Sequence, residues 1–132
     1  MEVGIKARDI MNEDFPILDA SLTLESCMKK LNAKQEACVI LNKGFVQFVL
    51  SYDELLKAFL KRKEKNVQLN EIKARKNFAV IKPETDVFEI IKIMKRGIDF
   101  VVVRDKNNIG LITKKELAEV NQFLFDVTYK RE

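Results

Sequence analysis

Histidine and tryptophan are absent from this chain of 132 residues, and cysteine occurs only twice. Without histidine, the Ser-His and Cys-His pairs that activate a nucleophile cannot form. Cys27 and Cys38 lack metal-ligand spacing, and two thiols without histidine make no zinc set. Nothing else marks a carboxylate pair such as Glu54 and Glu116 as catalytic. The sequence therefore predicts a protein that is not an enzyme and has no metal site.

Glycine and long apolar runs are also scarce. The four glycines are scattered, so no glycine-rich loop is available to cradle a phosphate. The longest apolar run, residues 45–50, is interrupted by Gln47 and is too short to span a bilayer. Residues 1–6 lack the hydrophobic core of an export signal. Because no apolar run can span a bilayer, we expect no membrane contact. Since the two cysteines have the pattern of small, reduced core residues, we expect a cytoplasmic protein.

Apolar and charged residues are plentiful, at 47% and 33% of the chain. That is enough for one compact domain, or two half-domains that share a core, under a charged surface. The net charge of +4 is concentrated in the middle of the chain, at Lys57, Lys61, Arg62, Lys63, Lys65, Lys73, Arg75 and Lys76. Such a cluster is typical of a solvated helix face and linker. Nucleic-acid contact is the less favoured alternative, because no aromatic residues interleave with the cluster and no nucleic-acid motif accompanies it.

The same pattern occurs twice in the chain. Residues 51–56, Ser-Tyr-Asp-Glu-Leu-Leu, end a β-rich run and open a helix, and residues 113–118, Thr-Lys-Lys-Glu-Leu-Ala, do so 62 positions later. The preceding segments match in order, 24–28 with 87–91 and 37–41 with 100–103. A repeat of this length is one supersecondary unit. Two copies that bury their apolar faces against each other leave a cleft suited to a small ligand, which predicts a two-lobed binding module.

Hydrophobic periodicity predicts the order β-α-β-β-α in both copies, an α/β (α+β) fold. In the first copy we expect a strand at 15–18, a helix over 22–33 capped by Ser21 or Thr23, strands at 37–41 and 45–50 joined by a tight turn, and a helix beginning at Ser51 or Asp53. In the second we expect a lead-in at 67–72, a strand at 78–81, a helix from 87 that ends at Gly97, strands at 100–103 and 109–112, and a helix capped by Thr113. Residues 1–14 are expected to be irregular.

This order, ending in Gly-Leu-Ile-Thr-Lys-Lys-Glu-Leu at residues 110–117, resembles the CBS domain. Copies in that family usually end in glycine, two apolar residues, Ser or Thr, two variable residues and Asp-Leu. Arg-Asp-Ile-Met at 8–11 is similar to the opening of many first CBS repeats, and residues 23–25 and 86–89 are similar to the family's helix start. The resemblance divides the chain into repeat 1 at 5–62, repeat 2 at 67–122 and a C-terminal tail at 123–132.

The resemblance implies a tandem CBS pair, standing alone, with its repeats related by a pseudo-twofold axis. Such modules commonly bind AMP, ADP, ATP, NAD or S-adenosylmethionine as regulatory ligands, with no essential cofactor. They act as sensors for partner proteins, often dimerise and are usually not catalytic. We therefore expect an adenosine derivative as ligand, a homodimer and an unidentified protein partner.

Candidate ligand residues lie at the ends of both repeats. At the Ser/Thr-x-x-Glu spacing, the carboxylate accepts hydrogen bonds from ribose hydroxyls, and the helix start favours a phosphate. The resemblance predicts one pocket containing Thr113, Lys114, Lys115, Glu116 and Leu111, together with Ile17 and the approach to Ala37 from the first copy. It predicts a second pocket containing Ser51, Glu54, Val80, Ile98 and Asp99. The first pocket is the favoured one. Its lysines suit a phosphate, while Ile17, Ala37, Leu111 and Val80 are either the apolar sandwich for a purine or ordinary core.

An alternative interpretation needs no ligand, because Ser/Thr-x-x-Glu is also the signature of a capping box. Phe48 stands where the family has glycine and is large enough to fill an adenine-sized space. Asp53 makes the mouth beside Ser51 acidic, and an unpaired Asp99 would repel a phosphate. These departures favour a second hypothesis, a degenerate CBS pair that serves only as a dimerisation scaffold.

Overall fold

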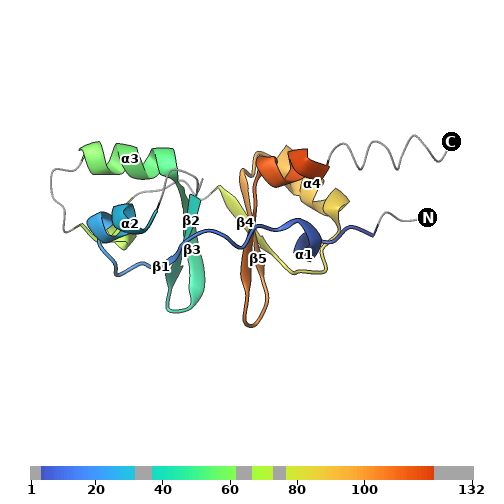
Figure 1. Cartoon of the computed structure of the whole chain (residues 1–132), viewed down its shortest axis with the longest axis horizontal. Helices are drawn as coiled ribbons and strands as arrows, with labels where there is room; N and C mark the ends of the chain where they lie inside the picture. The colour runs from blue at the N-terminus through green and yellow to red at the C-terminus, as the bar shows by residue number, and fades with distance from the viewer. Residues whose placement is uncertain (1–3, 32–36, 62–66, 73–76, 121–132) are drawn as a thin grey trace. The chain divides into compact units, whose positions relative to one another are not determined.

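The computed structural model describes residues 4–31, 37–61, 67–72 and 77–120. In these residues, helices and strands are interspersed along the chain (Figure 1). The elements are α1 (Ala7–Ile10), β1 (Ile17–Asp19), α2 (Leu24–Lys30), β2 (Ala37–Asn42), β3 (Phe45–Ser51), α3 (Tyr52–Lys61), a 3-10 helix η1 (Leu69–Glu71), β4 (Phe78–Ile81), α4 (Val87–Lys95), β5 (Phe100–Arg104), β6 (Ile109–Ile112) and a helix over residues 114–120. The strands form two sheets of three, which confirms the predicted mixed α+β fold.

The elements group into two compact units that each combine residues of both repeats. The first unit contains residues 14–76 with the sheet β1-β2-β3, and the second unit contains residues 1–13 and 77–132 with the sheet β4-β5-β6. The lead-in of the first repeat, within residues 1–13, therefore belongs to the unit that holds the second repeat's sheet. The lead-in of the second repeat, at residues 67–72, belongs to the unit that holds the first repeat's sheet. The repeat bounds 5–62 and 67–122 rest on sequence similarity and stay a prediction, and the predicted tail at 123–132 lies outside the described residues.

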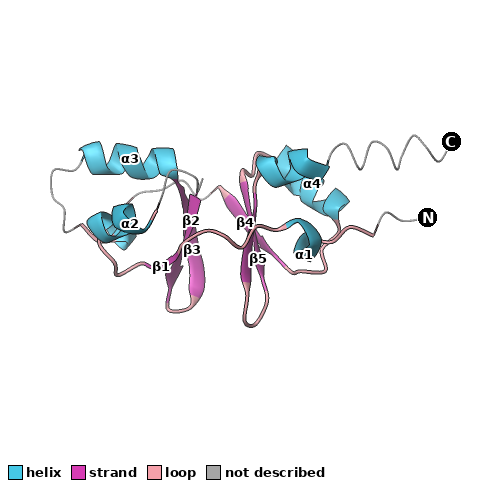
Figure 2. Ribbon diagram, viewed as in Figure 1, coloured by secondary structure: helices cyan, strands magenta, loops and turns pink. Residues whose placement is uncertain are grey.

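The two sheets have the same topology. The first strand of each is parallel to the second, and the second is antiparallel to the third. In the first unit α2 and α3 lie on one side of the sheet, and in the second unit α4 and the helix over 114–120 lie on one side of theirs (Figure 2). In the part of the chain that the structure describes, the other face of each sheet carries no helix of its own unit, so alternate strand residues meet different surroundings.

The first unit follows the predicted pattern closely. Lys43 and Gly44 have φ values of 53° and 83°, the pair of positive angles that a type I′ hairpin turn requires, which confirms the predicted turn. Thr23 caps α2 by accepting a hydrogen bond from the Ser26 N–H, so the helix begins at Leu24 rather than at residue 22. The lead-in of the second repeat completes this unit, because Leu69 is fully buried and its N–H donates to the Leu22 carbonyl at 2.8 Å.

The core of the second unit lies between α4 and its sheet. Six buried residues form one cluster, Ala7, Ile90, Met94, Val101, Val103 and Ile112. Helix α4 begins after Asp86, whose side chain accepts from the Phe88 N–H, and it ends before Gly97 at φ 97°. This confirms glycine as the residue that terminates the helix, since L-residues with side chains rarely adopt that backbone conformation.

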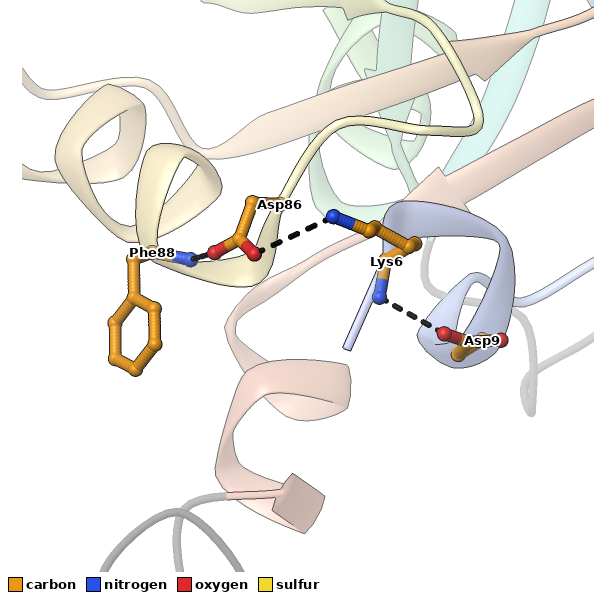
Figure 3. Close-up of polar contacts among 4 residues, drawn as sticks. All are labelled: Lys6, Asp9, Asp86 and Phe88. Atoms are coloured by element: carbon orange, nitrogen blue, oxygen red, sulfur yellow. Dashed lines mark hydrogen bonds and ion pairs between the residues drawn. The ribbon is translucent and has the colours of Figure 1, made fainter. Parts of the chain in front are cut away.

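The expectation that residues 1–14 are irregular was wrong, because Ala7–Ile10 form a helical turn, α1. Tertiary contacts explain the difference. The Ala7 N–H donates to the Thr85 carbonyl at 2.8 Å, and Ala7 is buried in the core of the second unit. The Lys6 N–H donates to the Asp9 carboxylate at 2.8 Å (Figure 3). A single turn of this kind shows no hydrophobic periodicity, so its sequence carries no helix signal.

The Asp86 carboxylate ties the N-terminal segment to the start of α4. One oxygen accepts from the Phe88 N–H at 2.9 Å, and the other lies 3.7 Å from the Lys6 Nζ (Figure 3). Both charged side chains are about one-third exposed, 32% for Lys6 and 36% for Asp86, so water screens the ion pair. The helix cap is therefore the larger of the two contributions.

Gly110 is required by the close approach of Met11. Asn12 and Leu111 exchange two backbone hydrogen bonds of 2.9 Å, which hold the N-terminal segment against β6. A Cβ atom on Gly110 would lie 2.3 Å from the Met11 Sδ and 2.8 Å from its Cβ. No real contact is that short, so any side chain at this position must displace the segment.

We expect Gly110→Ala to lower the free energy of unfolding by about 1–3 kcal/mol, because it overpacks this contact. Chemical denaturation of Gly110→Ala, Met11→Ala and the double variant measures the effect. Removing the Met11 side chain should relieve part of the clash, giving a coupling energy of about 1 kcal/mol. Strictly additive losses would show that the two residues do not meet.

Asp86→Ala should lower stability by about 1 kcal/mol through loss of the helix cap. Asp86→Ser is the matched control, because serine caps a helix about as well as aspartate and removes only the ion pair. Thermal unfolding should therefore place Asp86→Ser beside Lys6→Ala, both close to the unmodified chain. If serine is as damaging as alanine, the ion pair and not the cap is the main contribution.

Candidate functional site

The candidate residues gather where the third strand of each sheet passes directly into a helix. In the first unit, Ser51 ends β3 and lies opposite Ala37 in the sheet register, and Ile17 lies opposite Val39. Ile17, Ala37 and Ser51 are thus at the same end of one sheet. In the second unit, β6 ends at Ile112, so Thr113 begins the equivalent junction.

Ser51 and Glu54 form a capping box at the first junction. The Ser51 hydroxyl donates to Glu54 Oε1 at 3.1 Å, and the Glu54 N–H donates back to the Ser51 oxygen at 3.2 Å. A third bond, from the Ser51 N–H to Oε1, is long at 3.5 Å. Of the two predicted cap residues, Ser51 and not Asp53 starts the helix. Both members of the box are half-buried.

Thr113 and Glu116 form a tighter box at the second junction. The Thr113 N–H and hydroxyl both donate to Glu116 Oε1 at 2.7 Å, and the Lys115 N–H donates to the Thr113 oxygen at 3.2 Å. Only 7% of Thr113 and 6% of Glu116 is exposed. The box therefore fixes the carboxylate in one orientation. All of these bonds to Glu116 use Oε1, so the box itself does not involve Oε2.

Asp99 has two partners beside this second junction. Its Oδ1 lies 3.7 Å from the Lys114 Nζ, and its Oδ2 accepts a short hydrogen bond from the Asn77 side-chain amide. The antiparallel register of β5 and β6 explains the pairing. Val101 lies opposite Ile112, so Asp99, just before β5, and Lys114, just after β6, lie at the same end of the strand pair. The concern that an unpaired Asp99 would repel a phosphate does not apply, since Lys114 lies beside it. The exposed Lys115 is the second cation of this junction.

The apolar candidates differ sharply in exposure. Ile17 on β1 and Val80 on β4 are 42% and 48% exposed, and they hold equivalent places in the two sheets. Ala37 and Leu111 are buried, at 1% and 3%, and Ile98 packs against the core of the second unit. Ile17 and Val80 therefore offer surface to a ligand, whereas the other three have the surroundings of ordinary core.

The candidate residues are unevenly divided between the units. The first unit holds Ile17, Ala37, Ser51 and Glu54, and the second holds Val80, Ile98, Asp99, Leu111, Thr113, Lys114, Lys115 and Glu116. The second unit thus gathers charge, hydroxyl and apolar surface at one junction. Residues 35 and 36, which were expected to approach the favoured pocket, lie outside the described residues.

Phe48 in the first copy holds the place of Gly110 in the second, and the structure explains why the two residues differ. Gly110 leaves room for the Met11 side chain, while Phe48 is 3% exposed and pairs with Ile40 inside the first sheet. Asp53, which made the first junction acidic in the sequence, is exposed in the first turn of α3. The first junction therefore has two adjacent carboxylates, and no lysine borders them in sequence.

The sequence did not indicate a hollow of about 320 Å³ between α4 and the helix over 114–120. It is lined by Ile91, Met94, Lys95, Lys114, Leu117 and Ala118. Spacings of three and four residues place these side chains on facing helix surfaces, but the same spacing also predicts ordinary core. Asn77, the second partner of Asp99, had no sequence signal.

The basic cluster is only partly described. Lys57 and Lys61 are exposed on α3, and the other six members lie at 62–65 and 73–76, outside the described residues. Within the described ranges, no three potential ligands gather to hold a metal ion. No helix there has the length and apolar character that crossing a membrane requires.

Comparison with known proteins gives the family. Residues 69–122 match the family model of the CBS domain. The chain therefore contains a CBS domain at these residues. Among curated proteins no match was found. The resemblance inferred from the duplicated pattern is thus confirmed, and the matched residues include the Thr113 junction.

Solved structures similar to this chain cover most of its length. An acetoin utilization protein from Vibrio cholerae has a TM-score of 0.71 at 20% identity, over 97% of this chain and 98% of its own. A CBS domain protein of Thermoplasma acidophilum scores 0.68 at 21% identity, over 87% and 68%. The CBS domain of a bacterial CNNM/CorC family Mg²⁺ transporter, in complex with ATP, scores 0.69 at 16% identity, over 86% and 84%. These likenesses show a shared fold.

Glu116→Ala should lower the free energy of unfolding by about 1–3 kcal/mol, because two short bonds are lost at a buried position. The matched variant is Glu54→Ala, whose longer bonds at a half-buried site should make it cost less, about 0.5–1 kcal/mol. Urea unfolding of both variants measures the difference. Equal losses would show that burial does not distinguish the two boxes.

Proposed function

We propose that this protein is a regulatory CBS pair that binds an adenosine-containing ligand in the cleft between its repeats. Binding would be transmitted to a partner protein or to a second copy in a homodimer. The proposal is supported by the CBS domain at 69–122 and by the ATP complex of a CBS domain with the same fold. It assigns no catalytic step to the chain, and the cytoplasmic location stays a prediction.

The observation that carries the proposal is the repeated arrangement at the two sheet ends. Each unit has a hydroxyl and a carboxylate at the junction, and an exposed aliphatic residue on its first strand, Ile17 or Val80. An exposed aliphatic side chain suits the face of a purine, and a carboxylate suits ribose hydroxyls. Contact with a ligand would explain why exposed aliphatic residues occur at equivalent places in both copies.

The charge at the two junctions limits which adenosine derivatives are expected to bind. Near Thr113, Lys114 and Lys115 are balanced by Asp99 and Glu116, so the local formal charge is close to zero. The first junction carries Asp53 and Glu54. Among the described residues, neither place offers an excess of positive charge to a ligand with three phosphates. We therefore expect AMP or a similarly charged adenosine derivative to bind better than ATP.

Signalling requires that the ligand bind one arrangement of the protein more tightly than another, since only differential affinity shifts a conformational equilibrium. The fixed Glu116 carboxylate would contribute to the affinity for the arrangement that the ligand binds. Because its box holds Oε1 in place, a ligand bound there meets a preorganised acceptor and not a mobile side chain.

A ligand-free dimerisation scaffold is the second candidate. It is favoured by the capping boxes, which give both glutamates a structural role without any ligand. Burial of Ala37 and Leu111 also reduces the apolar surface open to a purine. Both candidates predict a homodimer, so ligand binding is the property that separates them.

A thermal-shift panel of AMP, ATP, NAD and S-adenosylmethionine tests the proposal. A ligand at a hundredfold excess over its dissociation constant should add about 2.7 kcal/mol to the free energy of unfolding. AMP should give a larger shift than ATP at equal concentration. A larger shift with ATP would refute the charge argument but not the binding function.

Val80→Asp and Ile17→Asp should abolish the shift, because they place a charge where the purine face is expected. The matched control is Leu60→Asp on α3, which replaces a residue that is 80% exposed and outside the predicted site. All three positions are exposed, so the folded state should tolerate the changes. No shift with any of the four ligands, together with a stable dimer in light scattering, would favour the scaffold.

A further inference from the structure

The two cysteines of this chain meet inside the first unit. Cys27 lies on α2 and Cys38 on β2, and their sulfur atoms are 3.9 Å apart. Both residues are 0% exposed, and both are free thiols. The prediction that both cysteines lie in the core is confirmed, but their contact was not foreseen. A pair of thiols in contact has redox chemistry that neither thiol has alone.

We propose that Cys27 and Cys38 form an oxidation site, at which hydrogen peroxide converts the two thiols into an intramolecular disulfide. This inference is independent of ligand binding, because it rests on the contact between α2 and β2 and not on the strand-to-helix junctions.

The geometry requires only a small movement. A disulfide bond is about 2.05 Å long, so the two sulfurs must approach by roughly 2 Å. Each sulfur moves when its side chain rotates about the Cα–Cβ bond, and α2 is a short helix of seven residues. Because Cys27 and Cys38 are eleven positions apart, the bond would close a short loop that joins the helix to the strand.

The surroundings give the two thiols different roles. A hydrogen bond with the Cys38 thiol lowers the pKa of Cys27, and the nearby positive charge of Lys30 lowers it further against the effect of burial. The same hydrogen bond raises the pKa of Cys38, and burial adds to the effect. Cys27 is therefore the thiol that loses its proton more readily. Cys27 is the nucleophile, and Cys38 is the resolving thiol.

The reaction balances with peroxide as the oxidant. The Cys27 thiolate attacks one oxygen, the O–O bond breaks, and the products are a sulfenic acid on Cys27 and hydroxide, which takes up a proton to become water. The Cys38 sulfur then attacks the Cys27 sulfur, the S–O bond breaks, and a second water leaves with the Cys38 proton. Two thiols and one peroxide give one disulfide and two waters. Peroxide is chosen because a small uncharged oxidant reaches a buried site that larger disulfides cannot enter.

The test treats the reduced full-length chain with hydrogen peroxide, removes the oxidant, unfolds the protein and alkylates every remaining thiol. Mass spectrometry should show a monomer that accepts no alkyl group and a peptide pair linked through Cys27 and Cys38. Dithiothreitol should restore both alkylation sites. Peptide mapping counts methionine oxidation separately. Two unreacted thiols, a disulfide between chains, or sulfinic acid without a disulfide would each overturn the proposal.

Single variants test the assigned roles. In Cys38→Ser, the Cys27 sulfenic acid has no resolving thiol and should accumulate, where dimedone traps it. In Cys27→Ser, the remaining Cys38 thiol should react with peroxide at least about tenfold more slowly than Cys27 does in Cys38→Ser, because burial still raises the pKa of Cys38. Circular dichroism checks that both variants fold, and the measurement on the unmodified chain does not depend on them. Equal reactivity of the two thiols would show that the roles are wrongly assigned.

Discussion

The pairing of Asn12 with Leu111 is the interaction on which much of the second unit depends. Buried backbone groups must find partners, and this pair exchanges two bonds between the first segment of the chain and its last strand. The pairing brings Met11 against Gly110, and the same segment forms α1 and reaches the start of α4. Thr113 follows Leu111 by two residues, so the candidate site begins directly after this pair of backbone hydrogen bonds.

The Ser/Thr-x-x-Glu pattern serves structure and, by our proposal, function with the same atoms. The capping bonds hold Oε1 of Glu54 and of Glu116, and they orient each carboxylate relative to its sheet. A carboxylate that is already oriented loses little entropy when a ligand binds. The structural and functional interpretations of this pattern are therefore compatible, because a preorganised acceptor needs a structural partner.

The local elements were predictable because their signals are local. Alternating and helical periodicities located the strands and α4, and the positive φ angles of Lys43 and Gly44 agree with the hairpin turn read from the sequence. The segment before residue 14 was misjudged, because α1 is stabilised by the Thr85 carbonyl, over 70 positions away. It was equally unpredictable that Val80 is exposed while Leu111 is buried, since both are aliphatic residues of strands.

The sequence by itself determined the duplication, the order of elements in each copy and the residue types at both strand-to-helix junctions. Periodicity and short-range capping depend on neighbours within a few positions, and these can be read directly from the order of residues. Only the tertiary structure decided that the lead-ins exchange units, that Asp99 meets Lys114 and Asn77, and that Cys27 touches Cys38. Such contacts depend on how separate elements pack, and many sequences with the same local pattern would pack them differently.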